Sequence, residues 1–393
     1  MLDRMAVGEL PKKPHTALRD PQGALRYEQC LTRAGFDGPF SILYHVGRPH
    51  ALTAQAPAHT AIPTLVPADP RAHDEAPTLR RRHFRTAALR VAGSLLDART
   101  PLLGHRELAL SICTATDSEG LYFANADADE LLFVREGRGV VRSVFGDLAF
   151  GPKDYVCIPK GVLRRVIVAE PLHALAIECS GLRIPTQYRN EAGQLRMDAP
   201  YSHRDFRRPE FTGPVDEGLR DVAIKRAGRH HLFRAHSSPL DVVGWDGTVY
   251  PWAFPILAFQ PRVSSVHLPP TWHGTFAAAS VLICSFVPRP LDFDAAAIPC
   301  PYPHASVDVD EVLYYVAGSF GSRTGVEPGS VTLHPRGVPH GPHPGRYEAS
   351  VGTTHTDELA VMLDSYEPLL PSSRAREYED LDYDESFLGG SGG

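Results

Sequence analysis

Short apolar runs separated by turn-forming residues recur along most of this 393-residue chain. Runs of this length, rich in β-branched side chains, are typical of strands. The clearest are Leu108 to Thr114, Leu131 to Val134, Gly139 to Val144, Tyr155 to Ile158, Arg165 to Val168 and Leu172 to Glu178. More follow at about 254–290 and 308–364, whereas helical periodicity is limited to one short helix predicted near Gly23 to Ala34. The pattern predicts a mainly β protein.

Proline and glycine strengthen this prediction, because the chain holds 36 and 33 of them, spread between the apolar runs as turns. The length suggests two or three domain-sized units. We expect an N-terminal arm at 1–90, a first β-barrel at 91–180, an irregular connecting segment at 181–250 and a second barrel at 251–370. A flexible acidic and glycine-rich tail is expected at 371–393.

Charge and cysteine usage exclude several classes of function. The net charge is −6 with 22% charged residues, so no field of one sign favours nucleic acid or a membrane surface. The one basic run, Arg80 to Arg85, is expected to be a solvated face, or else an anion or subunit contact. Six scattered cysteines without a CxxC pair predict free thiols. With no signal-like apolar segment, a cytoplasmic protein is expected.

An internal repeat relates the two strand-rich regions. Asn125-Ala-Asp-Ala-Asp-Glu130, with Gly137 after it, matches His304 to Glu311 followed by Gly318, with two residues fewer before the glutamate. Pro159-Lys-Gly-Val-Leu-Arg164 likewise matches Pro335-Arg-Gly-Val-Pro-His340. The first copy keeps the turn residues but has Asn, Asp and Arg in place of the histidines, and a guanidinium does not bind metals. The repeat predicts a double-barrel architecture whose first barrel carries no metal.

The second copy carries metal-type ligands. His304 and Glu311 lie in one predicted strand, and His340 ends the next after a Pro-x-Gly turn, a two-part pattern typical of cupin barrels. Two imidazoles and one carboxylate on one face of an ion leave open positions and favour non-haem Fe(II) handling O2. A carboxylate before the apolar run Val312 to Val316 is costly unless it pairs or binds an ion. Strand alternation turns Asp310 outward, although a bulge could make it the carboxylate instead.

Other histidines near the pattern are candidates for supporting roles. His334 would share a face with His340 and hydrogen-bond a metal ligand or the substrate, or be structural. His267 and His273 flank an aromatic loop, where either is a candidate acid–base group and packing beside Trp272 is the alternative. His343, beyond the Pro-Gly turn, is read as a residue at the mouth of the site.

At these residues the chain resembles the homogentisate 1,2-dioxygenase family. The resemblance extends over most of the length, and its most specific part runs from Gly329-Ser-Val-Thr-Leu-His334 to Pro339-His-Gly-Pro342. It implies an all-β double cupin subunit in a trimer or hexamer, with one Fe(II) held by His304, Glu311 and His340. It also implies a small aromatic substrate of the hydroquinone type that bears an acidic arm and is opened by O2. The catalytic residues implied are His273, favoured over His267, and His334; Tyr302, Phe320, His343 and His267 are the expected substrate contacts.

Departures from the family pattern affect the substrate more than the metal. Ala305 stands where the family has an arginine for the substrate carboxylate, and Phe320 stands where it has a tyrosine. The acidic arm must therefore be held by another cation, with Arg289 and Arg336 the first candidates, or be absent. Two other classes stay open: a cupin isomerase or decarboxylase that uses another metal, and a non-enzymatic cupin binding protein. Stoichiometric O2 consumption distinguishes the dioxygenase from both.

Overall fold

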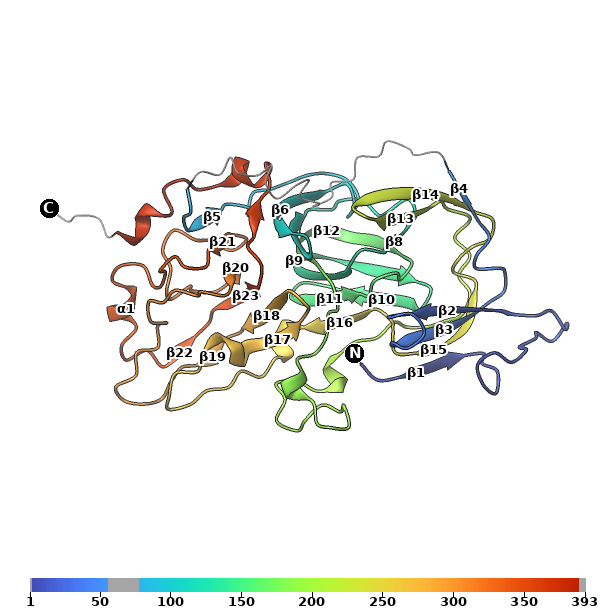
Figure 1. The fold of residues 1–393 in the computed structure, drawn as a ribbon, viewed down its shortest axis with the longest axis horizontal. Coiled ribbons are helices and arrows are strands. Elements are labelled where there is room, and N and C mark those ends of the chain that lie inside the picture. The colour runs from blue at the N-terminus through green and yellow to red at the C-terminus, as the bar shows by residue number, and fades with distance from the viewer. Residues whose placement is uncertain (1, 56–77, 389–393) are drawn as a thin grey trace.

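A computed structural model of the protein describes residues 2–55 and 78–388, and nearly all of its regular structure is β (Figure 1). The strands form sheets of twelve, six, four and two strands in the part of the chain described. Within these described ranges, one α-helix and several 3-10 turns accompany the strands: α1 (Arg346–Ala349), η2 (Thr186–Tyr188), η3 (His203–Asp205), η4 (Ile256–Ala258), η5 (Pro270–His273), η6 (Ala375–Tyr378) and η7 (Glu385–Phe387). No helix in the described ranges is long and apolar enough to span a membrane. The predicted mainly β fold is confirmed.

The twelve-stranded sheet contains the first barrel. Its strands follow the order β16 (Trp252–Pro255), β11 (Asp154–Ile158), β9 (Asp129–Ser143), β12 (Arg164–Cys179), β8 (Tyr122–Asn125), β13 (Val222–Arg226), β14 (Arg229–Ala235) and β4 (Leu52–Ala54). Beside this path lie β10 (Gly146–Phe150) on β9, β7 (Leu108–Cys113) on β12, β6 (Arg99–His105) on β7 and β24 (Leu370–Pro371) on β6. The long strands β9 and β12 each merge two predicted runs. Register shifts in β12 between Val168 and Ala174 bend it at the point where the runs were separated.

The six-stranded sheet contains the second barrel. Its order is β17 (Gly274–Ala277), β18 (Val281–Phe286), β23 (Leu359–Ser365), β20 (Asp310–Ala317), β21 (Val331–His334) and β5 (Arg82–Phe84). A short ribbon of β19 (Arg289–Pro290) and β22 (His355–Thr356) lies at its end. Because β5 comes from the predicted arm, and β24 and β16 pair with strands of the first barrel, strands cross the predicted segment boundaries. The predicted division of the chain remains a prediction.

The N-terminal arm supplies three strands of the four-stranded sheet, whose order is β1 (Met5–Gly8), β15 (Val242–Gly247), β3 (Phe40–His45) and β2 (Tyr27–Thr32). The helix predicted near Gly23 to Ala34 is wrong, because β2 pairs with β3 along its whole length. Cross-strand pairing outweighs the weak local preference of this segment. The connecting segment 181–250 is also more regular than predicted, since it supplies β13, β14 and β15.

The internal repeat is visible in the strand register. Glu130 on β9 lies opposite Ile158 and Glu178, and Glu311 on β20 lies opposite His334 and Asp364. Both glycines of the repeat require a left-handed backbone, with φ of 89° at Gly137, inside β9, and 85° at Gly318, just after β20. A Cβ at either position would also lie within 2.2 Å of a carbonyl oxygen, that of Pro171 or of Asp357. The chain therefore has the double cupin fold that the repeat predicts.

The two barrels pack against each other through a shared core. Phe133 and Tyr155 of the first barrel contact Tyr314 and Phe276 of the second, with ring centroids 6.1 and 5.4 Å apart. Two polar contacts also cross this interface. Tyr314 Oη lies 3.2 Å from His173 Nδ1, and the hydroxyls of Tyr155 and Ser285 are 2.9 Å apart. The second barrel is therefore held on a rigid neighbour rather than on a linker.

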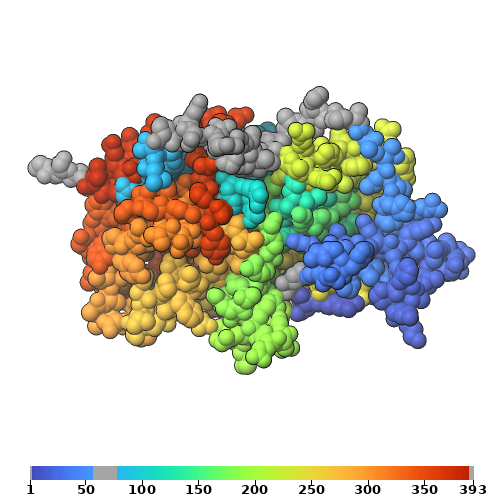
Figure 2. All heavy atoms as spheres, viewed as in Figure 1, coloured from blue at the N-terminus to red at the C-terminus, as the bar shows by residue number. Residues whose placement is uncertain are grey.

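The C-terminal segment is packed on the protein, so the prediction of a flexible tail is wrong for residues 371–388; residues 389–393 lie outside the described residues. Its acidic residues pair with the basic run Arg80 to Arg85. The basic run is therefore not simply a solvated face, as the sequence predicted. The pairs are Arg80 and Arg82 with Glu379, His83 and Arg85 with Asp380, and Arg81 with Asp384. Figure 2 shows this red segment beside the light-blue residues of the basic run. Tyr383 within it is only 3% exposed.

Candidate metal centre and cavity

Three side chains from neighbouring parts of the second barrel converge on one point. His304 precedes β20, Glu311 lies in β20, and His340 follows β21. One potential ligand atom from each residue lies within 4.8 Å of the others. His304 Nε2 is 4.0 Å from Glu311 Oε2, and His340 Nε2 is 3.7 Å from Glu311 Oε1. The three residues predicted as metal ligands are therefore brought together.

The orientation of the two histidines is set by the backbone. His304 and His340 form an antiparallel bridge in which each amide N–H donates to the other carbonyl at 2.8 Å. Each ring then places Nδ1 3.0 Å from a carbonyl oxygen two residues earlier, that of Tyr302 or of Val338. A carbonyl only accepts, so Nδ1 carries the proton and Nε2 keeps its lone pair toward Glu311. This is the orientation a metal ligand requires.

Glu311 is buried and ionised. Burial favours the neutral acid, but the hydrogen bond from His334 and the nearby His340 ring hold the pKa of Glu311 well below its usual range. His334 Nδ1 lies 2.8 Å from Glu311 Oε1, and its Nε2 lies 3.2 Å from the Tyr383 hydroxyl. Burial lowers the pKa of His334 to about 3, so this imidazole is neutral and donates to the carboxylate. His334 is fully buried and does not line the cavity, so the predicted hydrogen bond to the substrate is wrong. Its hydrogen bond goes instead to Glu311, a candidate metal ligand.

The donor set fits a divalent cation. His340 Nε2 is buried without a hydrogen-bond partner among the described residues, a costly state that an ion would relieve. Two imidazoles and one carboxylate match a borderline ion such as Fe(II). The alternative carboxylate, Asp310, faces elsewhere, because its oxygens accept from the amides of Arg336 at 2.8 Å and Leu369 at 2.7 Å. Asp310 is therefore not a metal ligand here.

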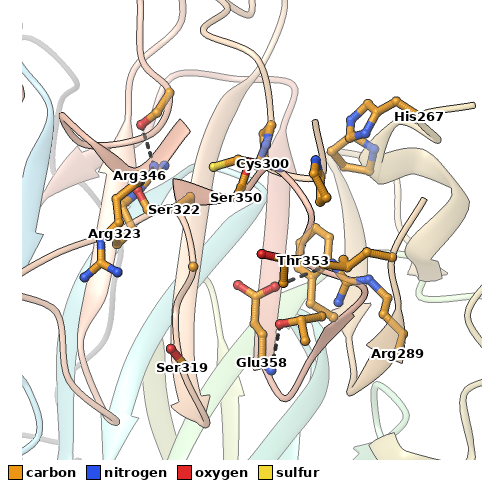
Figure 3. A pocket seen from close by; sticks show the side chains of 18 of the residues that line it. His267, Arg289, Cys300, Ser319, Ser322, Arg323, Arg346, Ser350, Thr353 and Glu358 are labelled. Atoms are coloured by element: carbon orange, nitrogen blue, oxygen red, sulfur yellow. Dashed lines mark hydrogen bonds and ion pairs between the residues drawn. The ribbon is translucent and has the colours of Figure 1, made fainter. Parts of the chain in front are cut away.

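A cavity of about 420 Å³ opens directly onto this cluster, and Figure 3 shows other side chains that line it. Its size is in the range of small-ligand sites. Glu311 and His304 form part of its wall, and apolar contacts come from Leu268, Phe286, Leu291, Leu313 and Met362. The cavity can hold a substituted aromatic ring next to the candidate metal ligands.

Two of the predicted substrate contacts line this cavity and two do not. Tyr302 and His267 lie in its wall, with their rings 5.3 Å apart. Phe320 is wrong as a substrate contact, because it turns inward and packs on Tyr315 at 4.7 Å. His343 is wrong as a mouth residue: it is 1% exposed and lies beneath the C-terminal segment. Its Nδ1 lies 2.6 Å from Thr324 Oγ1 and its ring 4.2 Å from that of Phe387.

The two candidate acid–base histidines differ in their surroundings. His273 ends η5, packs 4.9 Å from the ring of Phe286, and has no hydrogen-bond partner for its buried Nδ1 within the described chain. Burial, with the charge of Arg289, lowers the pKa of His273 to about 3, against the near-neutral value expected. His267 is about one-third exposed, and its Nδ1 lies 3.2 Å from a carboxylate oxygen of Asp292. A carboxylate partner orients an imidazole for proton transfer, so the geometry favours His267.

The predicted replacement cations are both already paired. Arg336 lies outside the cavity wall and contacts Asp310 and the Tyr366 carbonyl. Arg289 lines the cavity but lies 3.5 Å from Glu358, a carboxylate in the same wall. Sequence reasoning missed Glu358, Arg323 and Arg346, because they lie in segments without a motif and only the folded chain brings them to the cavity. It also missed Asp364, across from Glu311, whose pKa burial and the Glu311 charge raise to about 7.

The equivalent position in the first barrel holds a network of buried ion pairs. Arg164, which replaces His340, pairs with Glu119 and lies 3.1 Å from Glu130. Arg99 lies 3.0 Å from Glu130 and 2.5 Å from Glu178. Lys225 also pairs with Glu178, so three cations face three carboxylates. Although burial opposes it, Arg99 and Lys225 hold the pKa of Glu178 at about 2. Fixed cations thus occupy the place that a metal would take.

The chain is similar in sequence to known proteins, in one case over nearly its whole length. Residues 92–256 match the family described as homogentisate 1,2-dioxygenase N-terminal. A protein of Saccharolobus solfataricus, provisionally named a dioxygenase, is 33% identical over 385 residues, which cover 97% of each chain. The chain belongs to the homogentisate 1,2-dioxygenase family. Homogentisate 1,2-dioxygenases of Pseudomonas entomophila and Emericella nidulans are each 26% identical to it, over 71% and 58% of this chain and 68% and 53% of theirs.

Membership of the homogentisate 1,2-dioxygenase family makes the protein a dioxygenase of the cupin type, in a family of iron-dependent enzymes. Similar solved structures include a cupin barrel protein of Leptotrichia buccalis, with a TM-score of 0.31 and 11% identity over 68% of this chain and 88% of that one. Oxalate decarboxylase of Bacillus subtilis has a TM-score of 0.33 and 11% identity over 75% of this chain and 80% of its own.

Proposed function

We propose that the protein is an Fe(II)-dependent ring-cleaving dioxygenase of the extradiol type. Its substrate is homogentisate or a related hydroquinone-type aromatic, into which both atoms of O2 are inserted. The observation that carries the proposal is the convergence of His304, Glu311 and His340 beside a cavity of about 420 Å³. Two imidazoles and a carboxylate on one face leave positions for an aromatic hydroxyl and O2. This donor set would hold the ion.

When bound, Fe(II) supplies Lewis acidity and redox coupling between the aromatic hydroxyl and O2. The chain prepares that position in three ways. The carbonyls of Tyr302 and Val338 fix the protons of His304 and His340 on Nδ1. His334 holds one oxygen of Glu311 through its own Nδ1–H. The low pKa of Glu311 keeps a full negative charge at the centre, so no proton must be displaced before metal binding.

Side chains of the cavity wall position the aromatic ring and accept a proton from one of its hydroxyl groups. Leu268, Phe286 and Leu313 exclude water from one side and favour an apolar ring. His267, oriented by Asp292, accepts the proton of the hydroxyl that faces away from Glu311. Tyr302, 5.3 Å from the His267 ring, completes the edge of this subsite. His273 also lines the cavity, where its ring packs against Phe286.

An oxygen-electrode experiment tests the proposal. Fe(II)-loaded protein is supplied with homogentisate, gentisate, other hydroquinones and catechols, and O2 uptake is compared with loss of the aromatic substrate. We expect one O2 consumed per ring opened with at least one hydroquinone. Substrate conversion without O2 uptake would instead identify a cupin isomerase or decarboxylase, and no conversion of any aromatic would favour a binding protein.

A further inference from the structure

The cavity beside the candidate metal centre has an uneven distribution of charge. Three arginines line it: Arg289, Arg323 and Arg346. Arg289 is compensated, because it lies 3.5 Å from Glu358 and stacks over the ring of Phe286. Figure 3 shows Arg289 and Glu358 on one side of the cavity and Arg323 and Arg346 together on the other. The second side therefore carries the excess of positive charge.

Arg323 and Arg346 have no carboxylate partner in the part of the chain that the structure describes. Arg323 is 7% exposed, donates to the Gly341 carbonyl at 2.5 Å, and leaves a buried Nε without an acceptor. The Arg346 side chain, half-buried on α1, makes no hydrogen bond or ion pair with any described residue. Both guanidinium groups act on the same neighbours: burial lowers the pKa of His343 and both charges lower it further, and both oppose the burial that raises the pKa of Cys300. They form one positive wall.

Glu311 and Glu358 act on Arg323 through their charges, but neither forms an ion pair with it. Asp357 also lines the cavity, but it is exposed at the rim and accepts from the Ser319 amide at 2.8 Å. Burial raises the pKa of Cys300 to about 11, so its thiol stays neutral. Ser322 and Ser350 add hydroxyls beside the two arginines. A cationic wall with hydroxyl groups, facing an apolar cavity, fits a carboxylate attached to an aromatic ring.

We infer that Arg346, with Arg323 behind it, binds the acidic arm of an anionic hydroquinone substrate. The inference rests on the proposed function for the ring chemistry and adds the residue that selects the substrate. It places the acidic arm on the wall formed by α1 and the loop before β21, rather than beside position 305, where this chain has Ala305. Arg346 is free to form a bidentate pair without breaking an existing one, whereas Arg289 would have to leave Glu358.

Anaerobic binding to the Fe(II)-loaded protein tests the inference without turnover. Calorimetry compares homogentisate with methylhydroquinone, which has the same ring and no acidic arm. In Arg346→Gln we expect the Kd for homogentisate to rise about 10- to 100-fold, the range for loss of a charge-assisted pair. The Kd for methylhydroquinone should change less than about 2-fold, because no charged contact is lost. Arg346→Lys should recover part of the affinity for homogentisate only.

Arg106→Gln is the matched control, since the Arg106 side chain is 92% exposed and lies outside the cavity wall. Equal changes for both ligands in Arg346→Gln, or no homogentisate binding by the wild-type protein, would overturn the inference. O2 uptake on the same two compounds reports the proposed function separately. Ring cleavage that does not depend on Arg346 would overturn the anion site but support the dioxygenase function. Binding that depends on Arg346 without O2 uptake would support the anion site but contradict the dioxygenase function.

Discussion

The candidate ligands His304 and His340 owe their orientation to the chain immediately before them. Each imidazole is fixed by a carbonyl two residues earlier, and the two backbones pair directly. The spacing of these residues and of Glu311 along the strands is visible in the sequence, so the cluster could be predicted from it. Roles that depend on side-chain direction could not: Phe320 turns into the core, and His343 turns beneath the C-terminal segment.

The choice between His267 and His273 is a prediction at the same scale. His267→Gln should lower kcat about 10²- to 10⁴-fold, because a positioned acid–base group contributes that much to proton transfer. His273→Gln should change kcat less than about 10-fold and act mainly through packing on Phe286. Steady-state kinetics with the best hydroquinone measures both. Loss of kcat in the His273 variant alone would assign the proton transfer to His273 and contradict the role of Asp292 as orienting partner.

The C-terminal segment shows what a single element adds to the candidate centre. Its acidic residues pair with a basic run far earlier in the chain. Arg82 and Glu379, for example, are 297 residues apart. This contact places Tyr383 on His334, and His334 on Glu311. Strands could be predicted because their apolar runs are local signals. The docking of this segment could not, because complementary charges so far apart have many other possible partners before the chain folds.

Removing the Tyr383 hydroxyl should therefore weaken metal binding. In Tyr383→Phe we expect the Kd for Fe(II) to rise about 10-fold, the lower end of the range for residues that orient metal ligands. Tyr378→Phe, in η6 of the same segment, is the matched control and should leave the Kd unchanged. Anaerobic metal titration measures both variants. An unchanged Kd in Tyr383→Phe would mean that His334 holds Glu311 without help from the C-terminal segment.

At the scale of the whole molecule, His173 links the barrels and makes their packing sensitive to pH. Its ring contacts the Thr86 carbonyl and the Tyr314 hydroxyl, both at 3.2 Å. Burial lowers the pKa of His173 to about 4, below the ordinary value of about 6.5 that it regains on unfolding. Its contribution to stability is thus fully present above pH 6.5 and is lost as the pH falls from 6.5 toward 4.

Urea unfolding across this pH range measures that contribution. His173→Gln cannot be protonated, so its free energy of unfolding should fall by about 2 to 3 kcal/mol less than that of the wild-type protein between pH 7 and pH 4. His231→Gln, an exposed histidine on β14, should follow the wild type. Parallel pH profiles for all three proteins would show that His173 is not held neutral between the barrels.

The two barrels share a layout but differ in what fills it: a cluster of two histidines and a glutamate in one, and balanced buried ion pairs in the other. The repeat in the sequence predicts the shared layout, because glycine turns and strand register are local. It could not predict the ion pairs, because Arg99 and Lys225 come from strands outside the repeated motif. The central claim is that the second barrel alone holds one iron ion per chain.

Elemental analysis of protein reconstituted anaerobically with Fe(II) tests this claim most directly. Wild-type protein and the exposed control His50→Ala should contain close to one iron per chain. Glu311→Ala and His340→Ala should retain less than about a tenth of that while still unfolding cooperatively in the metal-free state, which separates loss of the ion from loss of the fold. Two irons per wild-type chain, or full iron content in Glu311→Ala and His340→Ala, would contradict the account.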